Sequence, residues 1–163
     1  MTEHVIHPIP PLYDSHSGIL ILGSFPSVKS REGRFFYNHP QNRFWKVLAA
    51  VEGCAVPETI PEKKDFLLSH GFALWDVIYE CDITGSSDAS VRNVIPSDIS
   101  VILRAAPVRR IITNGKTSDH YFQKFLRQTT DIPEICCPST SPANAAWSLE
   151  RLTEAWRAAI LGE

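Results

Sequence analysis

The sequence lacks long apolar runs, a strong excess of one charge, and any motif that starts a secreted chain. No stretch approaches the roughly 20 apolar residues that a helix needs to cross a bilayer, and Met1 is not followed by a basic segment and an apolar stretch. The 16 Lys and Arg residues and 18 Asp and Glu residues give a formal net charge of -2. Any contact with phosphates is therefore expected to be local.

Cysteine is scarce and has no ligand spacing. The four cysteines show neither a CxxC pair nor a partner pair of histidines, and they are Cys54, Cys81, Cys136 and Cys137. We expect them to be buried thiols in a reducing compartment, which predicts a cytoplasmic protein. His39 lies beside Pro40 in a loop and also lacks ligand spacing, so we expect it to be structural and expect no metal site.

Length and composition indicate one globular domain over residues 1–163. The chain is 44% hydrophobic and 21% charged, and it has neither repeats nor low-complexity segments. Residues 1–17 contain three prolines and three histidines and are expected to form an irregular lead-in.

Segments with strand character alternate with segments of helical spacing. The predicted strands are residues 19–22, 72–78, 109–113 and 134–137. Helices are predicted from residue 44, over 60–69 with a capping box at Thr59, from a cap at Ser97 to Pro107, around 121–126, and over 149–160. This alternation predicts an α/β fold, a three-layer α/β/α sandwich around a four-stranded parallel sheet.

Polar segments follow or lie beyond each predicted strand. They are residues 23–27, 82–93, 114–116 and 138–144. Ligands bind at the carboxyl ends of parallel strands, so we expect these segments to converge on one rim. Between residues 29 and 46, five basic residues stand against one acid and are interleaved with Phe35, Phe36 and Tyr37. This pattern is typical either of a solvated loop or of a stacking surface beside a phosphate track.

Three motifs resemble the uracil-DNA glycosylase superfamily. They are Gly23-Ser24-Phe25-Pro26-Ser27, Phe36-Tyr37-Asn38-His39-Pro40-Gln41-Asn42-Arg43-Phe44-Trp45 and Ser139-Thr140-Ser141-Pro142-Ala143-Asn144. The similarity extends over about residues 18 to 160. It is nearest to the hypoxanthine-DNA glycosylase branch, and the mismatch-specific uracil-DNA glycosylases share a similar His-Pro-x-Asn-Arg-Phe-Trp segment. It implies the same three-layer fold.

The resemblance implies that Asn42 positions the attacking water and that Ser139 stands where uracil-specific relatives have a catalytic His. In mismatch-specific relatives the water is held by an Asn at the position of Phe25, so this chain departs from them. Asn42 also directly precedes a predicted helix and is a good N-cap candidate. A serine donates one hydrogen bond without adding positive charge, so we expect weaker leaving-group stabilisation at Ser139.

Asp76 stands where relatives have a base-reading Asn. An ionised carboxylate only accepts hydrogen bonds, so it suits the N1–H of hypoxanthine or the N3–H of uracil and repels the N1 acceptor of adenine. The alternative is an Asp that caps a loop. The other expected substrate-binding residues are Gly23, Ser24, Phe25, Pro26, Tyr37 and Asn114.

A second group of residues is expected to contact DNA. It comprises Lys29, Arg43, Lys116, and the loop Ser141, Pro142, Ala143 and Asn144 that would fill the vacated base stack. Lys116 also suits an exposed lysine at a helix start, and residues 141–144 also suit a plain turn with an N-cap.

The resulting hypothesis is a monofunctional glycosylase that removes a deaminated base, foremost hypoxanthine, after flipping it out of DNA. The alternatives are a uracil or mismatch glycosylase, and a non-catalytic DNA or nucleotide binder. We expect a monomer with DNA as its partner, no membrane association and no cofactor. An iron–sulfur cluster is not expected because the chain lacks the N-terminal cysteine pair of the cluster-bearing branches.

Overall fold

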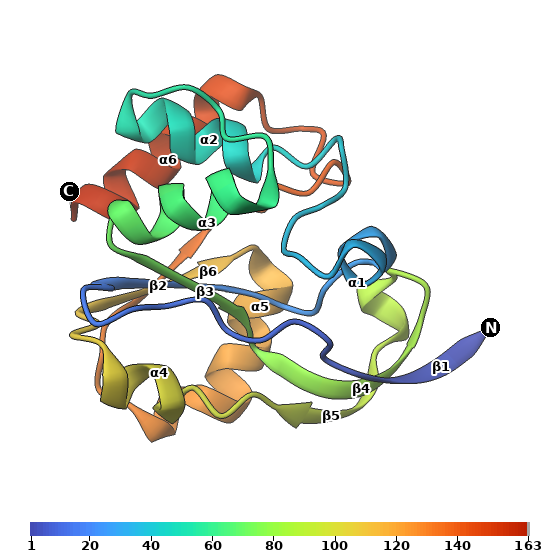
Figure 1. Ribbon diagram of the computed structural model, residues 1–163. Helices are drawn as coiled ribbons and strands as arrows, with labels where there is room; N and C mark the ends of the chain where they lie inside the picture. Colours follow the sequence, from blue (N-terminus) through green and yellow to red (C-terminus); the bar gives the residue numbers. More distant parts are fainter. Residues whose placement is uncertain (163) are drawn as a thin grey trace.

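A four-stranded parallel sheet forms the centre of the computed structural model, which describes residues 1–162 (Figure 1). Its strands lie in the order β3-β2-β6-β7. The apolar run of β2 is buried on both faces, as expected for a central strand covered by two helical layers. The strand bounds are β2 Ile19–Gly23, β3 Phe72–Asp76, β6 Arg110–Asn114 and β7 Glu134–Cys137.

Helices cover both faces of this sheet (Figure 1), which confirms the predicted three-layer α/β/α fold. One layer holds α2 Phe44–Glu52, α3 Ile60–Ser69 and α6 Leu149–Leu161; the other holds α4 Ser100–Ala105 and α5 Lys116–Tyr121. α5 continues through a π-helical turn, Phe122–Leu126, and a 3-10 turn, Arg127–Thr129. Among residues 1–162, no helix has the length and apolar character that a membrane span requires.

A second, antiparallel sheet was not predicted. It has the order β1-β4-β5 and lies beside the long loop after β2, which contains the short helix α1 (Figure 1). Its bounds are β1 Thr2–Ile6, β4 Ile78–Thr84 and β5 Arg92–Pro96, with α1 over Val28–Gly33 and a 3-10 turn over Asp88–Ser90. The prediction that residues 1–17 are irregular is therefore wrong for β1.

Two predicted boundaries also differ from the structure. The strand predicted over 72–78 ends at Asp76, because the next two backbone N–H groups donate to the carbonyls of Gly23 and Ser24 and turn the chain into β4. The helix predicted to start at Ser97 starts at Ser100, where Asp98 Oδ1 accepts from the Ser100 N–H at 3.1 Å. Ser97 is buried and its hydroxyl has no hydrogen-bond partner among the described residues, so it does not act as the cap.

Candidate active site

The parallel register brings the carboxyl ends of the central strands together. Gly23 ends β2 directly beside Asp76 at the end of β3, and Asn114 ends β6 beside Cys137. A pocket of about 1030 Å³ opens over these ends, and two of the predicted residues, Lys29 and Arg43, do not line it. The other predicted residues all do: Gly23, Ser24, Phe25, Pro26, Tyr37, Asn42, Asp76, Asn114, Lys116, Ser139, Ser141, Pro142, Ala143 and Asn144.

Asp76 is a buried carboxylate held by a residue that the sequence did not single out. Its Oδ2 lies 2.7 Å from Nε2 of His7, and both side chains are at least 95% buried. The Ile9 N–H donates to His7 Nδ1 at 3.1 Å, so this nitrogen accepts with its lone pair and carries no proton. The proton of a neutral imidazole is then on Nε2, which donates to Asp76.

Asp76 Oδ1 is the oxygen that lies against Gly23. A Cβ built on Gly23 would collide with Oδ1 and would lie 2.9 Å from the hydroxyl of Tyr37. The absence of a side chain at Gly23 therefore leaves room for a carboxylate oxygen and a phenol at the bottom of the pocket.

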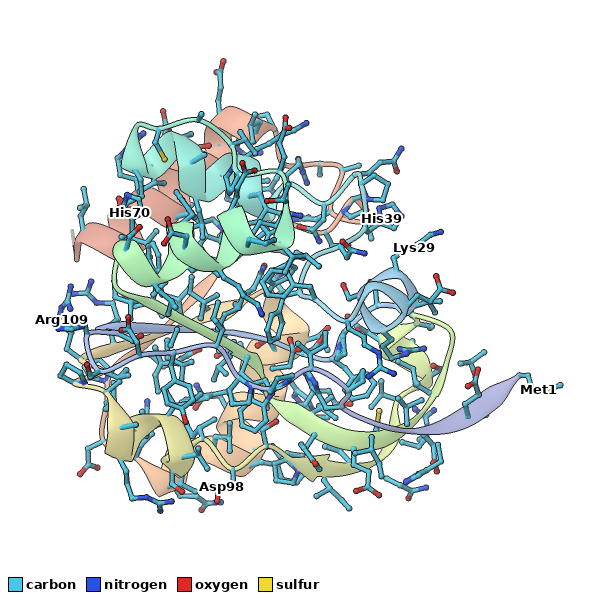
Figure 2. The ribbon with its side chains drawn as sticks, viewed as in Figure 1. Met1, Lys29, His39, His70, Asp98 and Arg109 are labelled. Atoms are coloured by element: carbon cyan, nitrogen blue, oxygen red, sulfur yellow. The ribbon has the colours of Figure 1, made fainter. Side chains whose placement is uncertain are left out.

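We expect Gly23→Ala to displace the Asp76 carboxylate. Overpacking of this kind costs about 1–3 kcal/mol, and small misplacements of a site group lower rates by up to about 100-fold. The matched control is Gly18→Ala, since a Cβ there would meet only the end of the Arg109 side chain, far from the loop that bears His39 (Figure 2). Melting curves and cleavage rates check this, and equal activity losses in both variants would contradict it.

Asn42 is oriented by a relay of three side chains. The Thr140 N–H donates to Asn114 Oδ1, and Asn114 Nδ2 donates to Thr140 Oγ1, both at 3.0 Å. The Thr140 hydroxyl then donates to Asn42 Oδ1 at 2.9 Å. Each donor in this chain determines the next acceptor, so the amide of Asn42 has one orientation.

The carbonyl of Asn42 is fully used by protein donors. Besides Thr140, the N–H of Phe44 donates to Oδ1 at 3.0 Å, at the start of α2. The formal cap residue of this helix is Arg43, whose side chain makes no capping bond, so Asn42 satisfies this helix-start donor from one position earlier. Both lone pairs of Oδ1 are occupied, which leaves the Nδ2 group as the part of Asn42 available to the pocket.

Ser139 lies on the opposite strand end, against Gly115. Its Oγ accepts from the Ser141 N–H at 3.1 Å, so its own O–H is available as a donor. Gly115 has a φ of 99°, and a Cβ there would lie 3.0 Å from Cβ of Ser139. The glycine allows the loop after β7 to approach the sheet.

Tyr37 presents a phenol beside Asp76. Its ring stacks on Phe44 at 4.1 Å, and its hydroxyl is buried without a protein partner in good hydrogen-bonding geometry among the described residues. Burial, and to a lesser degree the charge of Asp76, raises the pKa of Tyr37 well above its usual range. The phenol therefore remains protonated and is a donor at neutral pH.

Asp88 is a second carboxylate in the pocket wall that sequence reasoning did not identify. The Ser24 hydroxyl lies 3.4 Å from its Oδ1. Partial burial and the nearby Asp76 raise the pKa of Asp88. The sequence signal was the polar segment 82–93, but nothing in it distinguished Asp88 from its neighbours.

The aromatic residues of the long loop differ from the proposed stacking surface. Phe35 and Phe36 are buried in the core at 3% and 2% exposure, and Phe35 stacks on Trp45. Phe25 is also buried; its ring forms a T-shaped pair with the His7 ring, and the Arg31 guanidinium lies 5.8 Å from its centroid. Phe36 and Phe25 line the pocket, whereas Phe35 does not.

Arg43 holds the loop after β7 rather than projecting to solvent. Its guanidinium donates to the carbonyls of Trp147, Ser141 and Asn144. Three of its five N–H groups are engaged in this way, which differs from the expected phosphate contact. Lys29 and Lys116 are exposed; Lys29 lies on α1, on the same side of the molecule as His39 (Figure 2).

Arg43→Lys tests whether Arg43 holds the loop after β7, because lysine keeps the positive charge but lacks the several N–H donors of the guanidinium. We expect a lower melting temperature and slower cleavage, with an unchanged dependence of DNA affinity on salt. Lys29→Ala is the comparison, since loss of one phosphate contact lowers the log–log salt slope by about 0.9. Fluorescence anisotropy over a salt series measures both. A reduced slope for Arg43→Lys would assign Arg43 to phosphate binding instead.

Within residues 1–162, no three His, Cys, Asp or Glu side chains are arranged to hold a metal ion. The donors and acceptors in the pocket include one carboxylate oxygen at Asp76, a phenol at Tyr37, an amide N–H at Asn42 and a hydroxyl at Ser139.

Comparison with known proteins gives one consistent result. The family model described as the uracil DNA glycosylase superfamily matches residues 10–160. A protein named hypoxanthine DNA glycosylase from Methanosarcina acetivorans is 32% identical over 151 residues, covering 91% of this chain and 94% of the relative. One of the same name from Methanosarcina barkeri is 30% identical over 114 residues, covering 69% and 72%. The solution NMR structure of a protein described as a uracil DNA glycosylase from Methanosarcina acetivorans gives a TM-score of 0.77 at 31% identity, covering 97% of this chain and 96% of that one.

Proposed function

We infer the reaction from one premise: the chain belongs to the uracil-DNA glycosylase superfamily. It is a DNA glycosylase, an enzyme that hydrolyses the N-glycosidic bond of a deaminated base in DNA. We propose that the base is foremost hypoxanthine, which is the base in the name of both Methanosarcina relatives. The single structural observation that supports this choice is that Asp76 presents its Oδ1 as an acceptor at the bottom of the pocket.

The base must leave the duplex before it can reach this pocket. A volume of about 1030 Å³ is at the upper end of the range of small-molecule sites and provides room for a nucleotide rather than for a free base alone. The exposed Ala143 lies in the loop at the pocket rim, which supports the proposal that residues 141–144 fill the vacated position in the stack.

Base selection follows from the acceptor at Asp76. Hypoxanthine presents an N1–H to Oδ1, whereas adenine presents the lone pair of N1 and would leave two acceptors facing each other. A buried polar group left unpaired discriminates strongly between similar substrates. The Tyr37 phenol, 2.9 Å from the position of a Gly23 Cβ, is a donor on the same wall and suits a carbonyl oxygen such as O6.

The attacking water is held by Asn42 in this mechanism. Because Oδ1 accepts from Thr140 and Phe44, the Nδ2 group donates to the water oxygen and leaves its lone pair free for C1′. An oxocarbenium-like sugar is electrophilic enough to be attacked by a neutral water, so Asn42 has to orient the water and need not accept a proton. The glycosidic bond breaks as the bond from the water oxygen to C1′ forms, and the proton that the water loses neutralises the departing hypoxanthine anion. The Ser139 hydroxyl donates to the departing purine without adding charge.

Duplexes that contain one deoxyinosine, one uracil or one deoxyxanthosine test the proposed function. Each is incubated with the protein and then treated with alkali, with an undamaged duplex as the control. Scission at inosine that depends on alkali is expected for a monofunctional enzyme. Scission only at uracil would indicate a uracil or mismatch glycosylase, and binding without scission would indicate a non-catalytic binder.

We further propose that the protein acts in the cytoplasm as a monomer with one glycosylase domain and DNA as its partner. All groups assigned to the reaction come from one chain and line one pocket, which supports a monomer. The prediction that all four cysteines are buried is wrong for two of them, because Cys54 and Cys136 are exposed and only Cys81 and Cys137 are buried. All four are free thiols, which supports a reducing compartment.

A further inference from the structure

His7 has no place in the motifs that indicate a glycosylase, yet it is completely buried against the base-reading carboxylate. Its ring lies between Phe25, Phe36 and Trp75, with centroid distances of 5.8, 6.1 and 6.0 Å. Its backbone N–H donates to the Tyr79 carbonyl at 2.7 Å, which fixes this segment on β4. A buried imidazole with a defined partner on each nitrogen is held in one orientation.

The two oxygens of Asp76 therefore have different environments. Oδ2 accepts from His7 Nε2 at 2.7 Å and is covered by the imidazole, which does not itself line the pocket. Oδ1 lies against Gly23, and the Tyr37 hydroxyl lies near the same glycine. Only one oxygen of this carboxylate is presented to a base.

This difference matters because guanine is the abundant purine that also presents an N1–H. Guanine carries a second donor, the 2-amino group, next to N1, and a carboxylate that presents both oxygens pairs with both donors at once. Hypoxanthine has only the N1–H on this edge. A single presented oxygen satisfies the N1–H of hypoxanthine and leaves the amino group of guanine without a partner on Asp76.

We propose that His7 is a specificity-determining residue: by holding Oδ2 of Asp76, it limits the carboxylate to one acceptor and so excludes guanine. This role rests on the proposed function, in which the N1 edge of the base faces Asp76. His7 acts through Asp76 and does not touch the base.

Two substitutions separate the two hydrogen bonds of His7. His7→Gln places its amide nitrogen near the position of Nε2 and keeps the donor to Asp76. His7→Asn is shorter, so it keeps an acceptor near the position of Nδ1 for the Ile9 N–H and loses the contact with Asp76. Both substitutions remove the imidazole ring. If His7 had a purely structural role, both variants would therefore lose stability and base preference to a similar extent.

The experiment measures single-turnover release of hypoxanthine and guanine from matched duplexes, together with inhibition by the free bases. We expect His7→Gln to keep the preference of the wild type for hypoxanthine. We expect His7→Asn to reduce the preference for free hypoxanthine over free guanine, measured as the ratio of their affinities as inhibitors, by about tenfold or more. This is the effect of one hydrogen bond to a charged group.

The two possible failures are distinguishable. A wild-type protein that leaves deoxyinosine duplexes intact would refute the proposed function and this role with it. An active wild type whose two His7 variants show the same base preference would refute the role of His7 alone. Melting curves accompany both variants, and a variant that does not fold is replaced by His7→Leu, which fills the space, removes the donor and is expected to lower the same ratio.

Discussion

Replacing Asn42 by Ala is expected to lower the single-turnover rate of deoxyinosine cleavage by about 100-fold or more. The substitution removes the Nδ2 donor proposed to orient the water, and it leaves the Thr140 hydroxyl and the Phe44 N–H without their shared acceptor. DNA affinity should be unchanged, because the loss affects the chemical step. Quenched-flow cleavage and fluorescence anisotropy measure the two quantities.

Gln41→Ala is the matched control for Asn42→Ala. Gln41 is the neighbouring residue, its side chain is exposed, and it does not line the pocket. It should cleave at the rate of the wild type. If Asn42→Ala also retains that rate, the water is held by another group and the proposed role of the Asn42–Thr140–Asn114 relay is wrong.

Replacing Asp76 by Asn is expected to invert the base preference. His7 Nε2 donates to the position of Oδ2, so the amide oxygen of the new Asn occupies that position and its NH2 group occupies the position of Oδ1. The pocket then presents a donor to the N1–H of hypoxanthine, and we expect its excision to fall by about 100-fold or more. The N1 lone pair of adenine would instead be matched.

Competition between free hypoxanthine and free adenine measures this inversion. Asp88→Asn is the control, since it replaces a carboxylate of the same pocket without changing the acceptor for N1–H. It should keep the preference for hypoxanthine. An unchanged preference in Asp76→Asn would mean that the N1 edge is read elsewhere.

The strands of the central sheet and the capping box at Thr59 could be predicted from the sequence because they depend on local residues. The run Ile19–Leu22 has no polar face, so it could only be a strand covered on both sides. The capping box at Thr59 is confirmed: its hydroxyl accepts from the Glu62 N–H, and the Glu62 carboxylate accepts from the Thr59 N–H. Both patterns need only neighbouring residues.

The second sheet could not be predicted because its pairing is not local. His4 of β1 pairs with Asp82 of β4, and the exposed residues of β1 have no apolar alternation that would identify a strand. The contact of His7 with Asp76 also joins residues far apart in sequence, with a separation of 69 positions. A lone histidine followed by a proline gave no signal of a partner.

The residues of the pocket were predictable through strand ends and motifs, whereas their detailed contacts were not. The rule that ligands bind at the carboxyl ends of parallel strands brings Gly23, Asp76 and Asn114 together. The sequence predicted that Arg43 contacts DNA. Only the structure shows that its guanidinium donates to three carbonyls of the loop after β7.

Chromatographic identification of the base released from a deoxyinosine duplex tests the central claim most directly. The wild-type protein is predicted to release free hypoxanthine and leave an intact abasic strand, and Asp76→Asn is predicted to release little or none. Release of no base by the wild type, or release of uracil alone from a set of damaged duplexes, would contradict the claim that Asp76 selects a deaminated purine for excision.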